Sequence, residues 1–196
     1  MSFEQMIVYF GAPALCGLKS ANLLSVKSNQ FSSEKIIELN GKLASLGKRI
    51  VAVSRSSANV LLFIYDKSLL YKALCGKAQM LYLMRKSYPV SKGLDAIVKE
   101  LLFRMSWQMS FPHEVGLFLG YPLEDVVLFE KDGGRSSKFS GMWQVYGNVE
   151  EARRKMMQYR QCSFACSHYF DMGMEFSHIT KHYKEISKKI SGMEER

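Results

Sequence analysis

The chain has 196 residues, of which 47% are hydrophobic and 23% are charged, and it carries a formal net charge of +9 at pH 7. This composition supports a sizeable core in one domain or two small ones, so a folded chain is expected and a disordered one is not. The longest charge-free run, over 5–18, has 14 residues, fewer than the about 20 that a membrane-spanning helix needs, and four cysteines are too few for a disulfide scaffold.

The first third of the chain contains most of the predicted strands. Residues 2–10 favour a short helix that ends at Gly11 and Pro13, and a loop of small residues is expected from there to Ser20. Apolar spacing and turn residues then predict a strand, a helix and a two-stranded hairpin, over residues 22–27, 32–46, 49–54 and 59–65. The second hairpin strand is apolar on both faces, so we expect it at the centre of a sheet.

The rest of the chain is predicted to be mainly helical. Helical patterns cover residues 67–75, 77–87, 91–109, 111–131 and 148–170, and a strand is predicted over 142–146. An apolar stripe then resumes from Phe176 to Ile190. Few strands among many helices, without regular alternation, predict an α+β fold: a small, mostly antiparallel sheet of about three to four strands covered by many helices, with a long C-terminal helix. We expect a single α+β domain over 1–172 and a C-terminal helical extension over 173–196.

The positive charge is concentrated in the first half of the chain. Residues 1–110 hold 15 Lys and Arg against 6 Asp and Glu, whereas residues 111–148 hold 3 against 5. A basic surface attracts nucleic acids and anionic metabolites. The basic residues occur singly or in pairs, without a base-reading element, so binding to RNA or DNA is not favoured. One functional alternative is a regulatory or interaction protein that binds a nucleic-acid or protein partner through this basic surface.

A histidine and several carboxylates mark the middle of the chain. Pro112, His113 and Glu114 are predicted to open one helix, and residues 120–125 to open a second. A histidine beside carboxylates can transfer protons, and a helix N-terminus favours an anion. His113, Glu114 and Tyr121 are therefore the catalytic candidates. The alternative is that the acidic side chains balance helix dipoles and that His113 caps or packs.

The loop near the N-terminus supplies the other half of a predicted ligand site. Lys19 and Cys16 lie in the Gly- and Pro-containing stretch 11–20, and polar groups often converge in loops at helix ends. Together with Asp125 they are the ligand-binding candidates. If this loop meets the 112–125 segment, the protein binds a small molecule or cofactor, or is an enzyme. Its ligand would be an anionic small molecule in contact with Lys19; the sequence identifies no particular cofactor.

Two cysteines near the C-terminus suggest a third function. Cys162 and Cys166 are one helical turn apart and His168 follows them; two ligands at this spacing can share a metal ion. Cys166 also lies on the predicted apolar stripe, so core packing is favoured and no metal is predicted. A metal or thiol-redox protein built on Cys162, Cys166 and His168 is the alternative.

One string of residues is specific enough to suggest a family. It is His-Glu-x-Gly-x-Phe-Leu-Gly-Tyr-Pro-Leu-Glu-Asp-Val, over residues 113–126. With residues 12–23, 143–147 and 159–162, it resembles a bacterial family catalogued only as a domain of unknown function, number thirty-seven ninety-three. The resemblance implies a bacterial, one-domain protein, and it carries no activity, cofactor or catalytic residue.

The N-terminus shows no export signal. Glu4 lies among the first residues, without a basic start or a cleavage pattern. We therefore expect a soluble, cytoplasmic protein with no membrane partner, in which the cysteines remain thiols.

Overall fold

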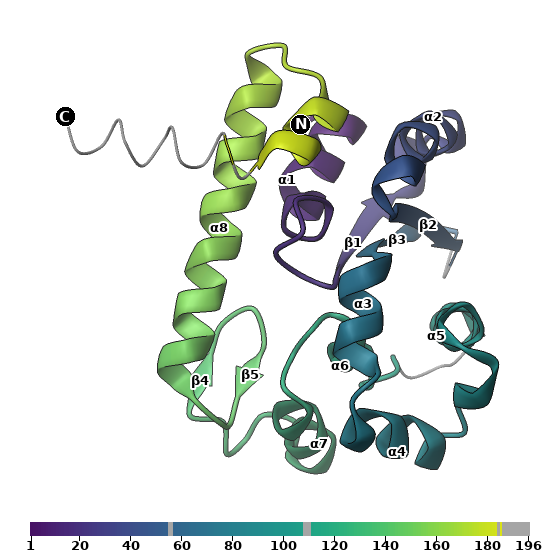
Figure 1. Cartoon of the computed structure of the whole chain (residues 1–196), viewed down its shortest axis with the longest axis vertical. Helices are drawn as coiled ribbons and strands as arrows, with labels where there is room; N and C mark the ends of the chain where they lie inside the picture. The colour runs from purple at the N-terminus through teal and green to yellow at the C-terminus, as the bar shows by residue number, and fades with distance from the viewer. Residues whose placement is uncertain (55–56, 108–110, 184, 186–196) are drawn as a thin grey trace.

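The structure is a computed structural model that describes residues 1–54, 57–107, 111–183 and 185. It confirms the predicted α+β class, with a small antiparallel sheet among helices and one long helix along its side (Figure 1). The strands are β1 (Ala21–Lys27), β2 (Lys48–Ser54), β3 (Asn59–Asp66), β4 (Phe139–Ser140) and β5 (Gln144–Val145). The α-helices are α1 (Phe3–Leu15), α2 (Ser33–Leu43), α3 (Lys67–Leu74), α4 (Lys77–Arg85), α5 (Leu94–Trp107), α6 (Val115–Phe118), α7 (Leu123–Asp132) and α8 (Val149–Asp171).

The main sheet has the strand order β1-β3-β2, and all of its pairs are antiparallel. The predicted hairpin strand over 59–65 is the central strand β3, as expected from its two apolar faces. Leu62 and Ile64 pack into one core cluster, whereas Phe63 and Tyr65 pack into a second one on the opposite face. This alternation follows from the twofold side-chain period of a strand. A separate small hairpin joins β4 and β5.

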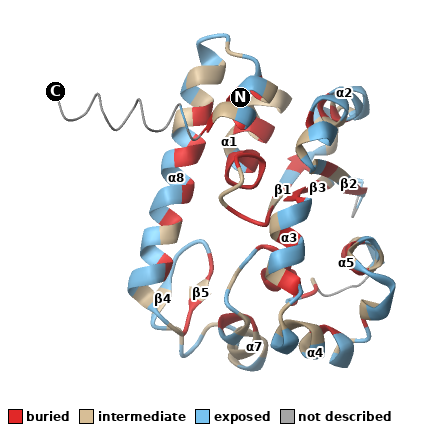
Figure 2. Cartoon of the chain, in the orientation of Figure 1, coloured by how far each residue is buried: buried red, intermediate tan, exposed pale blue. Residues whose placement is uncertain are grey.

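Two hydrophobic cores lie on the two faces of this sheet, and Figure 2 shows their buried residues on the inner sides of the helices. The first core joins α1, α2 and α8 to the sheet. The second core joins α3, α4, α5, α6 and α7 to the other face. A smaller cluster packs Trp143 and Val145 of the hairpin against Ala152 and Met156 of α8.

The prediction that the first helix ends at Gly11 is wrong, because α1 continues to Leu15. Gly11 is a close-packing position: a Cβ atom there would lie 2.9 Å from Cδ1 of Ile64 on β3. Pro13 lies in the last turn, and its carbonyl accepts hydrogen bonds from the amides of Leu18 (2.9 Å) and Lys19 (3.0 Å). The predicted loop over 11–20 is therefore wrong for residues 11–15, which belong to α1, and a tight turn over 16–20 leads to β1.

The segment after α8 returns to the first core. Phe176, Ile179 and Tyr183 are buried there beside α1 and α8. The proposed division into a domain over 1–172 and an extension over 173–196 stays a prediction, and Ile186 and Ile190 lie outside the described residues. None of the helices that the structure describes is long and apolar enough to cross a membrane.

Candidate functional site

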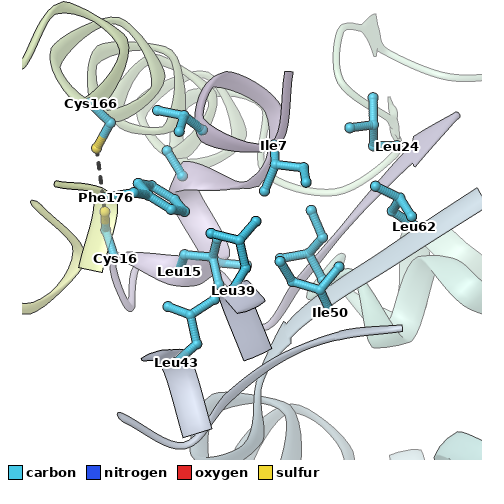
Figure 3. Close-up of a cluster of buried hydrophobic side chains, with 14 of the residues drawn as sticks. Ile7, Leu15, Cys16, Leu24, Leu39, Leu43, Ile50, Leu62, Cys166 and Phe176 are labelled. Carbon is cyan, nitrogen blue, oxygen red and sulfur yellow. Dashed lines mark hydrogen bonds between the residues drawn. The ribbon is translucent and has the colours of Figure 1, made fainter. Parts of the chain in front are cut away.

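Three cysteines that lie far apart in the sequence meet in the first core. Cys16 is the C-cap residue of α1. Cys162 and Cys166 lie one turn apart on the face of α8 that α1 covers. Because α1 packs along α8, the three side chains point into one cluster beside Phe176, and Figure 3 shows Cys16 facing Cys166 across the two elements.

The sulfur atoms of this thiol cluster (Cys16, Cys162 and Cys166) all lie within 4.8 Å of one another. The Sγ atoms of Cys16 and Cys166 are 3.4 Å apart, and those of Cys162 and Cys166 are 4.0 Å apart. Hydrogen bonds from Cys16 and Cys166 lower the pKa of the Cys162 thiol, since they stabilise its thiolate. The contacts with Cys162 and Cys166, together with burial, raise the pKa of Cys16. The cluster therefore holds one thiol that ionises more readily than its neighbours.

A pocket of about 390 Å³ reaches the thiol cluster at Cys16. Its lining includes Thr180, Lys181 and Tyr183 from the C-terminal segment, and Lys48 and Asp66 from the sheet. Lys48 and Asp66 neutralise one another through an ion pair of 2.7 Å. The pocket thus connects the thiol cluster to the surface at Cys16.

His168, the histidine predicted beside these cysteines, lies outside the thiol cluster. It is exposed, and its ring contacts Tyr169. Each helical residue turns the side-chain direction by about 100°, so a residue two positions after Cys166 points to the other side of the helix. Cys75 is also outside the cluster and is exposed on the surface.

A second pocket, of about 310 Å³, separates the 111–129 segment from the β4–β5 hairpin. We call it the aromatic pocket, because its lining includes five aromatic rings, namely Phe111, His113, Tyr121, Phe129 and Trp143. Tyr121 stacks on Trp143 with ring centroids 4.7 Å apart and an interplanar angle of 18°. His113 is exposed and meets the ring of Phe129 at 5.2 Å. Two catalytic candidates, His113 and Tyr121, therefore share one pocket.

Asp125 also lines this pocket, and its carboxylate holds the hairpin in place. It is 2% exposed. It accepts hydrogen bonds from Nε1 of Trp143 at 2.8 Å and from the amides of Tyr146 and Gly147 at 2.8 and 3.0 Å. Both carboxylate oxygens are thus engaged by the protein itself. These hydrogen bonds give Asp125 a structural role, because they fix the position of the pocket wall that carries Trp143.

Glu114, the third catalytic candidate, is turned away from the aromatic pocket. Its carboxylate accepts from the Arg104 guanidinium at 3.0 Å and from the Tyr88 hydroxyl at 3.1 Å. Arg104 also binds the carbonyl of Lys86 at 2.7 Å. This buried ion pair connects α4 and α5 to the start of α6.

Lys19 contacts the predicted partner segment without lining either pocket. Its Nζ lies 5.3 Å from the ring centroid of Tyr121 and 5.6 Å from that of Tyr159 on α8. The next residue, Ser20, donates a hydrogen bond of 2.7 Å to the carbonyl of Phe118. Burial lowers the pKa of Lys19 to about 8. The two segments that were expected to converge do touch, but Cys16 joins the thiol cluster instead of the aromatic pocket.

A family model described as "Protein of unknown function (DUF3793)" matches residues 7–180. The chain belongs to this family. The match confirms the family that the His-Glu-x-Gly string and its companion segments indicate. No curated protein and no solved structure matches the chain. Because the DUF3793 description names no activity, the geometry of the two sites is the basis for a functional proposal.

Sequence reasoning assigned Cys16 and the Cys162–Cys166 pair to different sites. The four-residue spacing of the pair shows that these two thiols share a helix face. Nothing in the sequence of this DUF3793 chain indicates that Cys16, 150 residues from Cys166, packs against that face. Trp143 was also missed as a pocket residue, although aromatic side chains are common in the walls of ligand sites.

Proposed function

We propose that this DUF3793 protein binds a thiophilic metal ion through Cys16, Cys162 and Cys166. The supporting observation is the spacing of the three sulfurs, which lie 3.4–4.8 Å apart. A metal ion bonded to thiolates at about 2.3 Å holds their sulfurs about 3.8–4.0 Å apart. Small rotations of the side chains are therefore enough to bring all three sulfurs to bonding distance.

The chemistry of the donor set selects the class of ion. Thiolates are soft ligands that favour Zn²⁺ and Cu⁺ over Mg²⁺ or Ca²⁺. Among the described residues, no histidine or carboxylate joins the three sulfurs within the same radius. Three thiolates alone suit Cu⁺, or they suit Zn²⁺ with a fourth position left for an external ligand. The pocket at Cys16 is the side from which that ligand would enter.

Binding would change the charge of the cluster. Without a metal ion, Cys16 and Cys166 keep their protons, because contact with Cys162 and burial raise the pKa of both thiols. A bound ion would displace those protons to the solvent. Lys181, which lines the pocket next to Cys16, would favour the negative charge of a metal–thiolate centre. The predicted cytoplasmic location would keep the thiols reduced.

The proposal is tested by metal titration of the reduced, metal-free protein under anaerobic conditions. We expect one equivalent of Co²⁺, a Zn²⁺ substitute, or of Cu⁺ to produce sulfur-to-metal charge-transfer absorption. Cys16→Ser should weaken binding about tenfold or more, because it removes one of three ligands. Elemental analysis of the protein as purified provides a second measurement.

Cys75→Ser is the matched control, because Cys75 is an exposed thiol outside the cluster. It should bind one equivalent with unchanged affinity. Circular dichroism should show that both variants keep the native fold. Metal uptake below stoichiometry in the folded, reduced protein would contradict the proposal, and so would an equal loss of affinity in Cys75→Ser and Cys16→Ser.

A further inference from the structure

The aromatic pocket is independent of the thiol cluster, and it has the size of a small-molecule site. Its volume of about 310 Å³ lies between two separate parts of the fold, the 111–129 segment and the β4–β5 hairpin, and it is open to solvent. Ligand sites in proteins occupy about 300–1,000 Å³ and are mainly apolar, with a few polar groups that orient the ligand. A pocket at the lower end of this range accommodates one or two fused rings.

The walls of the pocket favour a flat ligand. Aromatic rings attract other rings in offset stacked or edge-to-face arrangements, with centroids about 4.5–7 Å apart. Tyr121 and Trp143 already form such a stacked pair, and His113 and Phe129 form an edge-to-face pair. Because all four of these side chains line the pocket, a planar ring bound there has aromatic side chains from both pairs available for contact.

The wall that carries Trp143 is held in place before any ligand arrives. The Asp125 carboxylate fixes the indole, and the Tyr121 hydroxyl reaches the carbonyl of Met142 at 3.4 Å. Gly116 allows this arrangement, because a Cβ atom there would lie 3.1 Å from the ring of Tyr121. Preorganised walls lose little conformational entropy on binding, which favours affinity.

The polar groups of the pocket indicate where a ligand would form a hydrogen bond. The Asp125 oxygens are occupied, and the Gln144 side chain already pairs with Ser137 and Ser140. The His113 imidazole has no hydrogen-bond partner among the described residues, and it is exposed at the pocket. The described residues of the lining include a buried carboxylate and no lysine or arginine. A neutral ligand therefore fits this pocket better than the anionic one expected from the sequence.

We propose that the aromatic pocket binds a neutral, planar aromatic molecule of one or two fused rings. The ring system would lie against the Tyr121–Trp143 pair, and a hydroxyl group or ring nitrogen at its edge would form a hydrogen bond with His113. This inference does not depend on metal binding, because no residue of the thiol cluster lines the pocket.

The test uses naphthol as the probe and the indole N–H signals in proton–nitrogen correlation spectra as the readout. The chain has two tryptophans. Trp143 lines the pocket, whereas Trp107 on α5 is 77% exposed and serves as an internal reference. We expect naphthol to shift the Trp143 signal saturably and to leave the Trp107 signal in place. Decalol, the saturated counterpart with the same skeleton, should bind about fivefold more weakly because it cannot stack.

Variants and a charged analogue test the role of His113. His113→Ala should weaken naphthol binding about fivefold through the lost hydrogen bond. His168→Ala, which removes another exposed histidine, should leave the affinity unchanged. Naphthoate should bind more weakly than naphthol because of Asp125. Cys16→Ser, which disables the proposed metal site, should bind naphthol normally, so the two proposals fail separately.

Three results would overturn the inference. The first is that naphthol shifts neither indole signal, or both of them alike. The second is that decalol binds as tightly as naphthol, which would show that flat rings are not preferred. The third is an equal effect of His113→Ala and His168→Ala, which would show that His113 does not contact the ligand.

Discussion

Lys19 is a buried cation with no carboxylate beside it among the described residues. It is 7% exposed, and its ammonium group lies near the rings of Tyr121 and Tyr159. Because burial opposes the charged form, the pKa falls from 10.5 to about 8. The folded state therefore binds fewer protons than the unfolded state between these two pH values, and stability should rise with pH across that window.

Lys19→Met should remove this pH dependence. The cost of burying the charge is fully present below pH 8 and is lost as the pH rises toward 10.5. At pH 7 the variant should be more stable than the native protein by about 3 kcal/mol, from 1.36 kcal/mol for each pKa unit. Urea unfolding of both proteins at pH 7 and at pH 10 measures the difference. If the difference in stability between the two proteins is the same at pH 7 and pH 10, Lys19 is not the source of the pH dependence.

The thiol cluster shows what the sequence can predict at the scale of single residues. The spacing of Cys162 and Cys166 was enough to place both thiols on one helix face. The position of Cys16 was not predictable, because it depends on how α1 crosses α8, and side-chain packing fixes that crossing only in the folded molecule. The role of Glu114 was not predictable either. The sequence made it a catalytic candidate, but in the structure its carboxylate forms an ion pair with Arg104.

At the scale of elements, the predictions from hydrophobic pattern were confirmed where the pattern is strong. β3 was expected to be central because both of its faces are apolar, and it lies between β1 and β2. The end of α1 was missed because Gly11 and Pro13 usually stop a helix. Here Gly11 is required for the close approach of α1 to Ile64, a contact that no local signal reveals.

One buried carboxylate ties the β4–β5 hairpin to α7. Asp125, near the start of α7, accepts three hydrogen bonds from Trp143, Tyr146 and Gly147, and the Tyr146 hydroxyl also donates one to Asp132 at the end of this helix. Asp125→Ala should lower the free energy of unfolding by about 3 kcal/mol, because it leaves buried donors without a partner. Asp125→Asn should cost less, since its amide oxygen can still accept from the two backbone amides.

Denaturant unfolding, followed together with the Trp143 indole N–H signal, measures this effect. Glu124→Ala is the control, because this neighbouring side chain is exposed and its loss should change stability by no more than about 0.5 kcal/mol. Equal stability of Asp125→Ala and Glu124→Ala would show that the hairpin is held by packing and does not need the carboxylate.

At the scale of the whole molecule, β3 connects the two cores. Leu62 and Phe63 are neighbours in the chain, and both are fully buried, but they pack on opposite faces of the sheet. A change in either core therefore acts on the same strand, and through it on the other core. We expect the protein to unfold as one cooperative unit, as small single domains usually do.

Leu62→Ala and Phe63→Ala should each lower the free energy of unfolding by about 2–5 kcal/mol, because each removes buried apolar volume from a packed core. Both variants should still show a single transition, with the same midpoint by far-ultraviolet circular dichroism and by tryptophan fluorescence. Lys27→Gln is the control, because it changes an exposed residue at the end of β1 and leaves both cores intact. Its free energy of unfolding should stay close to that of the native protein. Two transitions with different midpoints in one variant would contradict this prediction. They would show that the core left intact folds on its own and that β3 is a boundary between two folding units.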